Sequence, residues 1–338
     1  MITFCETQLS KLWRAFGKLI YDITRKVFFN TFHNKSTTET FQTLHQFLKQ
    51  NKNLLKKLIW HNDDIKGFFT AIPHEAIISS FEFMVHKYID RFLPRNADLQ
   101  DSWITVDYDC PAKKPRTIQG RAIKTKTSVR FRIVDIIPLV KMCLRTSMFT
   151  SLGKIHSQIR GSCIGNPSSP PISEVPIAFK EFMWQEIFNV IINDTLFACR
   201  YVDNRLLCLP NHLDCLPRWR ILSDLFFYDH PVELEKEPGM TFLGFDIDIH
   251  QGTVQYVYPK KSWHFRSPKS AGKTSTLLSG LVSRIHLIAR HSYPEDLVKP
   301  TIKHLIKMYI NIGFTNDQII ACIKKTLKQY DIRKDQVM

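Results

Sequence analysis

The chain has 338 residues, of which 44% are hydrophobic and 23% charged, with only 12 glycines and 17 prolines. This balance is typical of a packed globular protein and excludes a disordered or fibrous chain. The 47 lysines and arginines outnumber the 31 aspartates and glutamates, leaving a net charge of +16, which excludes an acidic solvating protein and makes nucleic acid the leading partner.

The first part of the chain alternates between helical and extended patterns. Apolar residues at helical spacing predict two helices within residues 7–59. A strand-like stretch follows over 58–69, and Pro73 precedes a helix that we expect over 76–92. Residues 94–133 show no helical stripe and become rich in lysine and arginine, so we interpret them as a basic insertion.

The middle of the chain contains the clearest hairpin. Apolar periodicity predicts a helix over 133–148, a Gly/Ser/Pro-rich loop occupies 161–171, and a long helix is expected over 173–192. The run FACRYVDNRLLCL (197–209) consists of two apolar stretches that meet at a polar tip. This pattern indicates a tight β-hairpin, although Asp-Asn is a weaker turn signal than Asn-Gly.

The last third combines strands with a helical unit. A helix is expected over 213–227 and a second set of antiparallel strands over 232–259. Residues 275–330 show the pattern of two or three amphipathic helices and predict a separate C-terminal helical unit. The residues expected to break these helices are Pro294, Pro300 and Gly313.

Other sequence features restrict the setting. No segment reaches the roughly 18 consecutive apolar residues of a membrane span, and the first residues lack the apolar run of a secretory signal. The eight cysteines show neither a CxxC pair nor zinc-finger spacing. We therefore expect no membrane partner, reduced thiols and an intracellular location.

Two aspartates stand beside turns at the ends of predicted strands: Asp64 in HNDDIKGFFTAIPH and Asp203 in RYVDN. Two-metal phosphoryl transfer uses carboxylates from separate strands to hold two divalent cations. Each aspartate taken alone is better explained as an ordinary turn residue. Asp63 is a rival for the first position, but the spacing to Ile72 and Pro73 favours Asp64.

The flanking residues resemble reverse transcriptases. The run Asp64-Ile-Lys-Gly-Phe-Phe-Thr-Ala-Ile-Pro-His is similar to their first catalytic motif, above all in Penelope-like retroelements and telomerases, and Tyr201-Val-Asp-Asn resembles their Tyr-x-Asp-Asp motif. Gln158-x-x-Gly161-x-x-x-Gly165-x-x-x-Ser169-Pro170 has the spacing of the Penelope-like template and nucleotide loop. VELEKEPGMTFLGFDI resembles the stretch that leads into the primer-grip hairpin, and GLVSRIHLIARHS resembles the thumb.

The resemblance, which covers roughly residues 58–325, implies an α+β right-hand polymerase with an antiparallel palm sheet, partial fingers and a helical thumb. No match to the family's upstream fingers motifs precedes Asp64, and the basic insertion is the candidate substitute. The implied domains are an N-terminal helical support or fingers (1–57), a first palm segment (58–93), the basic insertion or fingers (94–133), the remaining palm (134–262) and the thumb (275–330).

The resemblance also implies a catalytic and nucleotide-binding site. Asp64 and Asp203 would hold two Mg²⁺ or Mn²⁺ ions, with the Ile65 carbonyl as a further candidate ligand. Asn204 replaces the usual second aspartate of the motif, which removes a negative charge and leaves activity open. The expected nucleotide-binding residues are Ile65, Phe69, Gln158, Gly161 and Gly165.

The ring of Phe69 would lie under the incoming sugar and clash with a 2′-hydroxyl, which favours deoxynucleotides; alternatively it is a core residue paired with Phe68. The two glycines, Gly161 and Gly165, would allow close backbone approach to the nascent pair, or merely form a flexible loop.

Primer and template contacts follow from the same resemblance. Tyr201 would pack beneath the primer terminus, and Phe242, Leu243 and Gly244 would begin the hairpin that holds it; Gly244 stands where Penelope-like elements usually have aspartate. These positions are also compatible with core strand residues. Basic side chains would contact phosphates, unless they form a solvated face: Lys260, Lys261, Lys113, Lys114, Arg116, Arg121, Lys124, Lys126, Arg130 and Arg132.

The function implied is RNA-directed DNA polymerisation, with an RNA template, a DNA primer and deoxynucleotide triphosphates as partners, and a nuclear location if the source is eukaryotic. Two alternatives remain open. In the first, the chain is a degenerate, domesticated relative that binds nucleic acid without polymerising. In the second, it is a telomerase-like catalytic subunit that requires a dedicated RNA.

Overall fold

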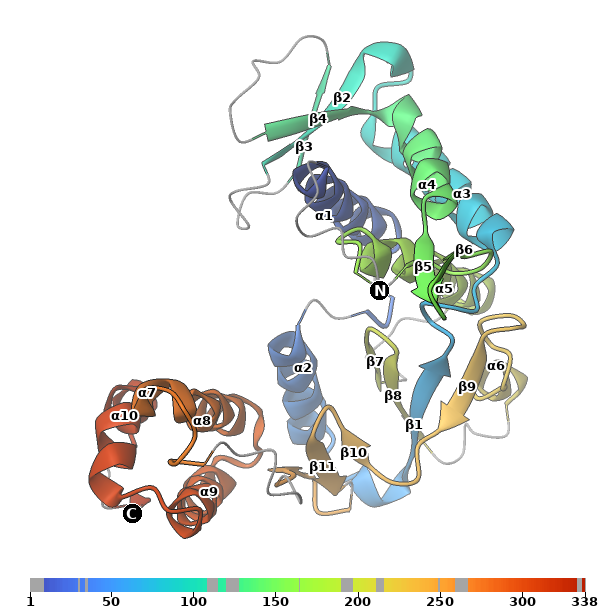
Figure 1. Ribbon diagram of the computed structural model, residues 1–338. Helices are drawn as coiled ribbons and strands as arrows, with labels where there is room; N and C mark the ends of the chain where they lie inside the picture. Colours follow the sequence, from blue (N-terminus) through green and yellow to red (C-terminus); the bar gives the residue numbers. More distant parts are fainter. Residues whose placement is uncertain are drawn as a thin grey trace. The chain divides into compact units, whose positions relative to one another are not determined.

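The protein is described by a computed structural model that divides into two compact units (Figure 1). Unit 1 comprises residues 1–33, 63–205 and 212–236, and unit 2 comprises 34–62, 206–211 and 237–338. The structure describes residues 9–29, 31–33, 36–107, 115–119, 128–163, 165–189, 197–210, 216–248, 250–258, 267–332 and 336–337.

Unit 1 has a helical core. Helices α1 (Ser10–Val27), α3 (His74–Phe92) and α5 (Ser169–Phe188) pack against one another, and α4 (Ile136–Arg145) packs on α3 (Figure 1). The buried side of α1 is apolar, as its periodicity predicts. Most of α5 is buried, which places two of its glutamates in the interior.

A four-stranded sheet carries the predicted hairpin. Its strand order is β7 (Phe197–Tyr201), β8 (Asn204–Pro210), β1 (Leu58–Lys66) and β9 (Glu233–Lys236). Strands β1 and β9 are antiparallel. The predicted hairpin over 197–209 is confirmed, with a two-residue loop between β7 and β8. The short helix α6 (Pro217–Leu222) lies within the longer helix predicted there.

The basic insertion forms a separate antiparallel sheet in unit 1. Its central strand β2 (Ser102–Asp107) pairs with β3 (Arg116–Gln119) and β4 (Ser128–Arg132). The buried residues of β2 include Ile104 and Val106, and the strand packs on α1. The insertion is thus anchored to the helical core by ordinary alternation of apolar residues.

The predicted helix over 133–148 is too long. Helix α4 ends at Arg145, and Met148 begins a two-stranded hairpin of β5 (Met148–Ser151) and β6 (Lys154–Ser157). All eight strand residues are exposed. Because a short apolar run is compatible with a helix end and with a strand, periodicity could not separate the two.

Unit 2 combines a small sheet with helices. The sheet contains β10 (Thr241–Phe242), β11 (Phe245–Asp248) and β12 (Thr253–Tyr256), and α2 (Thr37–Gln50) precedes it in the chain. The helices that follow are α7 (Thr274–Leu277), α8 (Ser279–His291), α9 (Val298–Asn311) and α10 (Asn316–Gln329). Short 3₁₀ turns occupy Leu55–Lys57, Leu99–Asp101, Ile133–Asp135 and Glu295–Leu297.

The C-terminal segment is helical as predicted, but it is not a separate unit, because unit 2 also contains residues 34–62, residues 206–211 and the β10–β12 sheet. Pro300 does not break a helix, because it lies in the first turn of α9, where a backbone N–H has no intrahelical partner to lose. Helix α10 begins with a capping box of Thr315 and Gln318.

The described residues form a mixed α/β protein with antiparallel sheets, in agreement with the predicted α+β class. Within them, no helix combines the length and apolar character that crossing a bilayer requires. Five cysteines are free thiols, at Cys143, Cys163, Cys199, Cys208 and Cys322, whereas Cys5, Cys110 and Cys215 lie outside the described residues.

Candidate active site

The two predicted metal-binding aspartates come from neighbouring strands. The backbone N–H of Ile65 donates a hydrogen bond to the carbonyl oxygen of Asp203 at 2.9 Å. Asp64 directly precedes Ile65, so this bond places the backbones of Asp64 and Asp203 side by side although they are remote in the sequence. Both side chains are half-buried.

Asp63 has a different role from its neighbour. Its Oδ2 accepts hydrogen bonds from Arg205 Nη2 at 2.6 Å and Nε at 3.1 Å, and both side chains are buried. Successive side chains of a strand point to opposite faces, so Asp64 points away from this ion pair. Asp63, the rival candidate for the first position, therefore forms a buried ion pair with Arg205.

The face that carries Asp64 also carries other charges. Asp64 lies opposite Glu235 in the β1–β9 register, and Lys66 Nζ lies 2.9 Å from Glu235 Oε2. The hydrogen bond to Glu235 raises the pKa of Lys66, and the charges of Glu235, Glu233 and Asp64 raise it further. Negative charge thus surrounds this lysine on the strand face.

The tip of the β7–β8 hairpin has a strained backbone. Val202 and Asp203 form its two-residue loop, and Val202 has a φ of 58°. A positive φ at the first central residue matches a type II′ turn, where glycine is preferred, and is unfavourable for a β-branched residue. At the next position, Asn204 Nδ2 donates to Asp203 Oδ1 at 2.9 Å.

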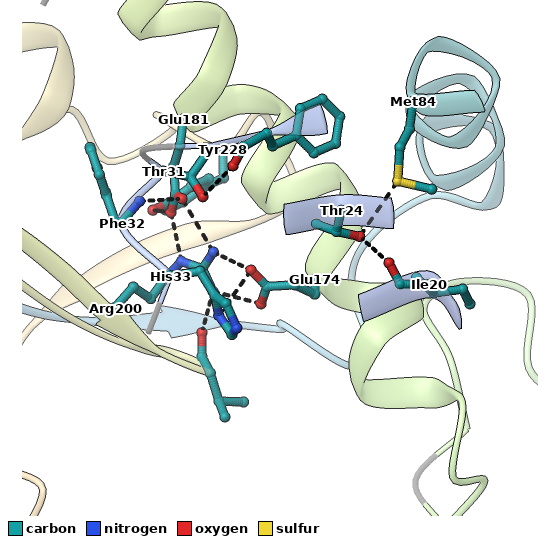
Figure 2. A network of polar contacts seen from close by, with 12 residues as sticks. Ile20, Thr24, Thr31, Phe32, His33, Met84, Glu174, Glu181, Arg200 and Tyr228 are labelled. Atoms are coloured by element: carbon teal, nitrogen blue, oxygen red, sulfur yellow. Dashed lines mark hydrogen bonds and ion pairs between the residues drawn. The ribbon is translucent and has the colours of Figure 1, made fainter. Parts of the chain in front are cut away.

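A buried polar network (Figure 2), which we call the Arg200 network, contacts this tip through the carbonyl of Val202. Its centre is Arg200 on β7, whose side chain is fully buried. Its guanidinium donates five hydrogen bonds: Nε to Glu181 Oε1 (2.6 Å), Nη2 to Glu174 Oε1 (2.6 Å) and Glu181 Oε2 (3.2 Å), and Nη1 to Glu174 Oε2 (2.8 Å) and the Val202 carbonyl (2.9 Å). Burial alone lowers the pKa of Arg200, but the two carboxylates raise it well above its ordinary value.

Other elements complete the network. Glu181 also accepts hydrogen bonds from the Phe32 N–H at 3.1 Å and from Tyr228 Oη at 2.9 Å. His33 Nδ1 lies 3.2 Å from Glu174 Oε1 (Figure 2), and burial lowers the pKa of His33. The glutamates lie at positions i and i+7 of α5, which puts both on one helix face.

The sequence interpretation missed this network, although two signals for it exist. Arg200 interrupts an otherwise apolar strand pattern, and Glu174 and Glu181 interrupt an apolar helix pattern. A charge that is predicted to be buried must be paired. Pairing the two patterns would have suggested these partners.

The predicted nucleotide loop docks on the turn that follows β1. Gly161 N–H donates to the Ile72 carbonyl at 2.6 Å, and Ser162 N–H donates to the Phe69 carbonyl at 2.9 Å. Gly161 has a φ of 67°, and a Cβ placed on it would lie 2.1 Å from Phe69 O. Gln158 Nε2 lies 3.4 Å from the same oxygen. Glycine is therefore required for the loop to approach the first motif.

Buried side-chain hydrogen bonds join the described residues of this loop. Ser162 Oγ bonds Ser173 Oγ at 2.8 Å, and Ser168 donates through its backbone N–H and hydroxyl to Asn166 Oδ1. Gly165 has a φ of 110°. Four polar side chains of the described part of this segment are thus buried and hydrogen-bonded.

Phe69 is half-buried, and its ring makes an edge contact with the buried ring of Phe68 at 4.9 Å between centroids. Beside the same turn lies a cleft of about 650 Å³, lined in part by Thr70, Gln158 and Arg160. The ring of Phe69 is thus partly accessible, as a nucleotide contact requires, while it also packs in an aromatic pair.

The predicted primer-holding residues lie in two places. Tyr201 is half-buried at the end of β7 in unit 1. In unit 2, Phe242 is fully buried against Phe41, while Leu243 (φ 49°) and Gly244 (φ 81°) form the turn between β10 and β11. Phe242 agrees with both interpretations, as a core strand residue and as a hairpin residue, whereas Leu243 is a half-buried turn residue and agrees only with the hairpin interpretation.

Most of the predicted phosphate contacts fall on undescribed positions. Lys113, Lys114, Arg121, Lys124, Lys126, Lys260 and Lys261 lie outside the described residues, as does the side chain of Arg116. Of the others, the guanidiniums of Arg130 and Arg132 lie over the Trp103 ring at 5.2 and 5.9 Å. Arg132 also forms a two-fold hydrogen bond with Asp135.

The donor set fits a hard divalent cation. Mg²⁺ at nucleotide sites takes one or two protein carboxylates and completes its shell with water and phosphate oxygens. Asp64 and Asp203 supply two carboxylates from adjacent backbones. No three His, Cys, Asp or Glu side chains converge as a metal site in the described part of the chain. Two carboxylates are the number of protein ligands that a cation shared with a phosphate substrate takes.

Comparison of the whole chain with known proteins adds to this geometry. No protein-family model and no curated protein matches the sequence. Among solved structures, a telomerase from Candida albicans in complex with a fragment of telomeric RNA gives a TM-score of 0.56 at 12% identity, covering 96% of this chain and 54% of that one. The fold of this chain is similar to that of about half of this telomerase chain.

Two telomerase structures from Candida tropicalis agree. The complex with a telomeric RNA fragment gives a TM-score of 0.55 at 13% identity, over 96% of this chain and 48% of that one. The apo telomerase gives 0.53 at 14% identity, over 94% and 50%. This chain spans about half the length of each telomerase chain. The predicted resemblance to telomerases is confirmed at the level of fold, whereas the likeness to Penelope-like elements stays a prediction.

Proposed function

We propose that the chain is an RNA-directed DNA polymerase that adds deoxynucleotides to a primer 3′-end on an RNA template. The observation that carries the proposal is the hydrogen bond from Ile65 N–H to the Asp203 carbonyl, which brings Asp64 next to Asp203. The telomerase fold supports it. In this assignment the four-stranded sheet is the palm, the β2–β4 sheet belongs to partial fingers, and α8–α10 form the thumb.

The proposed roles follow from the chemistry of the side chains. Asp64 and Asp203 would hold two Mg²⁺ or Mn²⁺ ions, with the Ile65 carbonyl as a further oxygen ligand. When bound, such ions neutralise charge on the triphosphate during in-line attack by the primer hydroxyl. The amide of Asn204 adds no charge beside Asp203, so we expect weaker retention of the second ion than a second aspartate would give.

Three further residues would shape the nucleotide site. The half-buried ring of Phe69 would lie under the sugar and exclude a 2′-hydroxyl. Gly161 brings its loop against the Phe69 backbone, and Gln158 lines the adjoining cleft. The proposal implies an intracellular location, which is nuclear in a eukaryotic source.

Primer extension on poly(rA) primed with oligo(dT) tests this function. We expect incorporation of thymidine nucleotide with Mg²⁺ or Mn²⁺ that disappears in Asp203→Ala and in Asp64→Ala. Asp90→Ala is the matched control, because Asp90 is an exposed aspartate on α3, and it should retain full activity. Tight binding of the primed template without incorporation under either metal would instead support the degenerate nucleic-acid binder.

The telomerase fold favours a second candidate, a telomerase-like subunit that copies a dedicated RNA. Purification from the native cell followed by sequencing of bound RNA separates this candidate from a retroelement enzyme. Recovery of one small RNA at near-equal molar ratio supports the telomerase-like subunit. Recovery of the chain's own messenger RNA, or of no defined RNA, contradicts it.

A further inference from the structure

We infer that Arg200 is a positioning residue that fixes the direction of the Asp203 side chain through the peptide group between Val202 and Asp203. The inference rests on the proposed function only for the role of Asp203 as a metal ligand. The geometric part stands on the Arg200 network and on the strained turn of the β7–β8 hairpin (Figure 2).

The peptide group is the physical link. Arg200 Nη1 donates to the Val202 carbonyl at 2.9 Å, and that carbonyl belongs to the same rigid plane as the N–H of Asp203. Holding the carbonyl therefore holds the plane from which the Asp203 Cα continues. The next carbonyl, that of Asp203, accepts the Ile65 N–H at 2.9 Å. Both peptide planes around Asp203 are thus anchored, one by Arg200 and one by the strand that carries Asp64.

The turn needs such an anchor because its backbone is strained. A non-glycine residue held at positive φ costs about 1–3 kcal/mol and persists only where its surroundings determine the conformation. Val202, with a φ of 58°, is β-branched and therefore an unfavourable case. A charged donor on its carbonyl is a contact that can maintain this conformation.

Stability alone does not account for the network. A buried ion pair is often replaceable by apolar side chains without loss of stability, so its presence is weak evidence for a stabilising role. Here one guanidinium lies between two buried carboxylates, which leaves the three groups with a net charge of −1, and all five of its N–H donors are bonded. This arrangement fixes Arg200 rigidly, as a positioning role requires.

Hydrogen–deuterium exchange of the peptides that cover residues 197–206 tests the inference on the full chain. Arg200→Lys keeps the charge but has three donors instead of five, so it must lose bonds. We expect exchange in this hairpin to accelerate about tenfold, the effect of losing one charge-assisted hydrogen bond. Val202→Gly relieves the positive φ, so in its background the same Arg200→Lys change should accelerate exchange clearly less.

Tyr228→Phe is the matched control. It removes one hydrogen bond to Glu181 but does not touch the turn, so its effect on exchange should be the same with and without Val202→Gly.

Glu174→Gln is a milder second variant that keeps the side-chain shape if Arg200→Lys fails to fold. In primer extension, Arg200→Lys and Glu174→Gln should each lower kcat while leaving KM for the primer–template unchanged.

Two results would overturn the inference: hairpin exchange unaltered in a folded Arg200→Lys protein, or equal effects of Arg200→Lys with and without Val202→Gly. The outcomes also separate the two proposals. If the wild-type protein does not polymerise, but the effect of Arg200→Lys on exchange depends on Val202, the positioning role of Arg200 is supported and the proposed function is contradicted. If the protein polymerises, but the effect of Arg200→Lys on exchange does not depend on Val202, the proposed function is supported and the positioning role is contradicted.

Discussion

At the residue scale, the two adjacent aspartates Asp63 and Asp64 lie in different environments because a strand alternates its faces. Asp63 pairs with Arg205 in the interior, where the exposed fractions of the two side chains are 3% and 0%. Asp64 points to the other face and is half-buried. The sequence could identify the pair of aspartates, but only the buried arginine decides which of them is structural.

This difference predicts opposite phenotypes for isosteric substitutions. Asp63→Asn leaves the buried charge of Arg205 without its counter-ion, so the free energy of unfolding should fall by about 3 kcal/mol. Asp64→Asn replaces a half-buried carboxylate, so it should cost less stability than Asp63→Asn while abolishing incorporation. Urea denaturation and primer extension on both variants check this; a stable Asp63→Asn protein would show that the Arg205 pair contributes nothing.

A pair of glycines gives a second residue-scale prediction. Gly161 and Gly153 have similar φ values of 67° and 73°, but a Cβ meets Phe69 O at 2.1 Å at the first position and nothing within 4 Å at the second. Alanine at either position adds backbone strain of about 1 kcal/mol. Gly161→Ala should cost several times more and reduce nucleotide incorporation. Thermal melting and primer extension compare them, and equal losses of stability would exclude the clash as the cause.

At the element scale, local patterns predicted most elements but not their partners. The β7–β8 hairpin, α2 and the helices after residue 275 follow from periodicity. The β5–β6 hairpin was missed because its exposed strands carry apolar residues, such as Phe149 and Ile155, without a buried face to set an alternation. The contacts of Arg200 with α5 join distant segments, and no single segment contains the information that pairs them.

The end of α8 predicts how stability depends on pH. His291 is buried and stacks on Phe41 with ring centroids 4.6 Å apart, and its backbone carbonyl lies 2.9 Å from His45 Nε2. Burial, and then the charges of His45 and Arg290, lower the pKa of His291 from 6.5 to about 4. Below pH 6.5 the unfolded chain therefore takes up a proton that the folded chain refuses until about pH 4. This histidine's contribution is complete above pH 6.5 and is lost as the pH falls toward 4.

We expect His291 to account for up to about 3 kcal/mol of the stability lost over this range. His291→Phe keeps the ring stacking without the titration, so its stability should fall less steeply with acidity than that of the wild type. Burial also lowers the pKa of His45, so the stability of His291→Phe should still fall with acidity, but with a smaller slope. Urea denaturation at several pH values measures the difference, and parallel curves would contradict the assignment.

At the scale of the whole molecule, the division into two units does not follow the chain. Helix α1 belongs to unit 1 and α2 to unit 2, so the predicted N-terminal segment 1–57 contributes to both. Strands β1 and β8 also pass from one unit to the other. Changes of composition and helix-breaking residues mark boundaries along the sequence, but they cannot reveal a unit that is assembled from separate segments.

If the molecule binds nucleic acid as proposed, its net charge of +16 predicts that binding depends strongly on salt. Each phosphate that is neutralised releases counter-ions, so a contact with about six phosphates lowers affinity about a thousandfold between 50 and 200 mM salt. Helix α9 presents Lys299, Lys303 and Lys307 at positions i, i+4 and i+8, which places them on one helix face. If this face contacts the duplex backbone, replacing all three with glutamine should make the slope of log affinity against log salt shallower by about 2 to 3.

A matched change of charge shows whether position or total charge matters. Lys52, Lys56 and Lys57 are exposed and precede β1, so their replacement with glutamine removes the same three charges elsewhere. Fluorescence anisotropy with a labelled RNA–DNA duplex measures the slopes for both triple variants and the wild type. Because a phosphate contact acts locally whereas net charge acts through a screened field, only the α9 variant should lose slope. Equal, small changes in both variants would mean that α9 contributes no more than its charge.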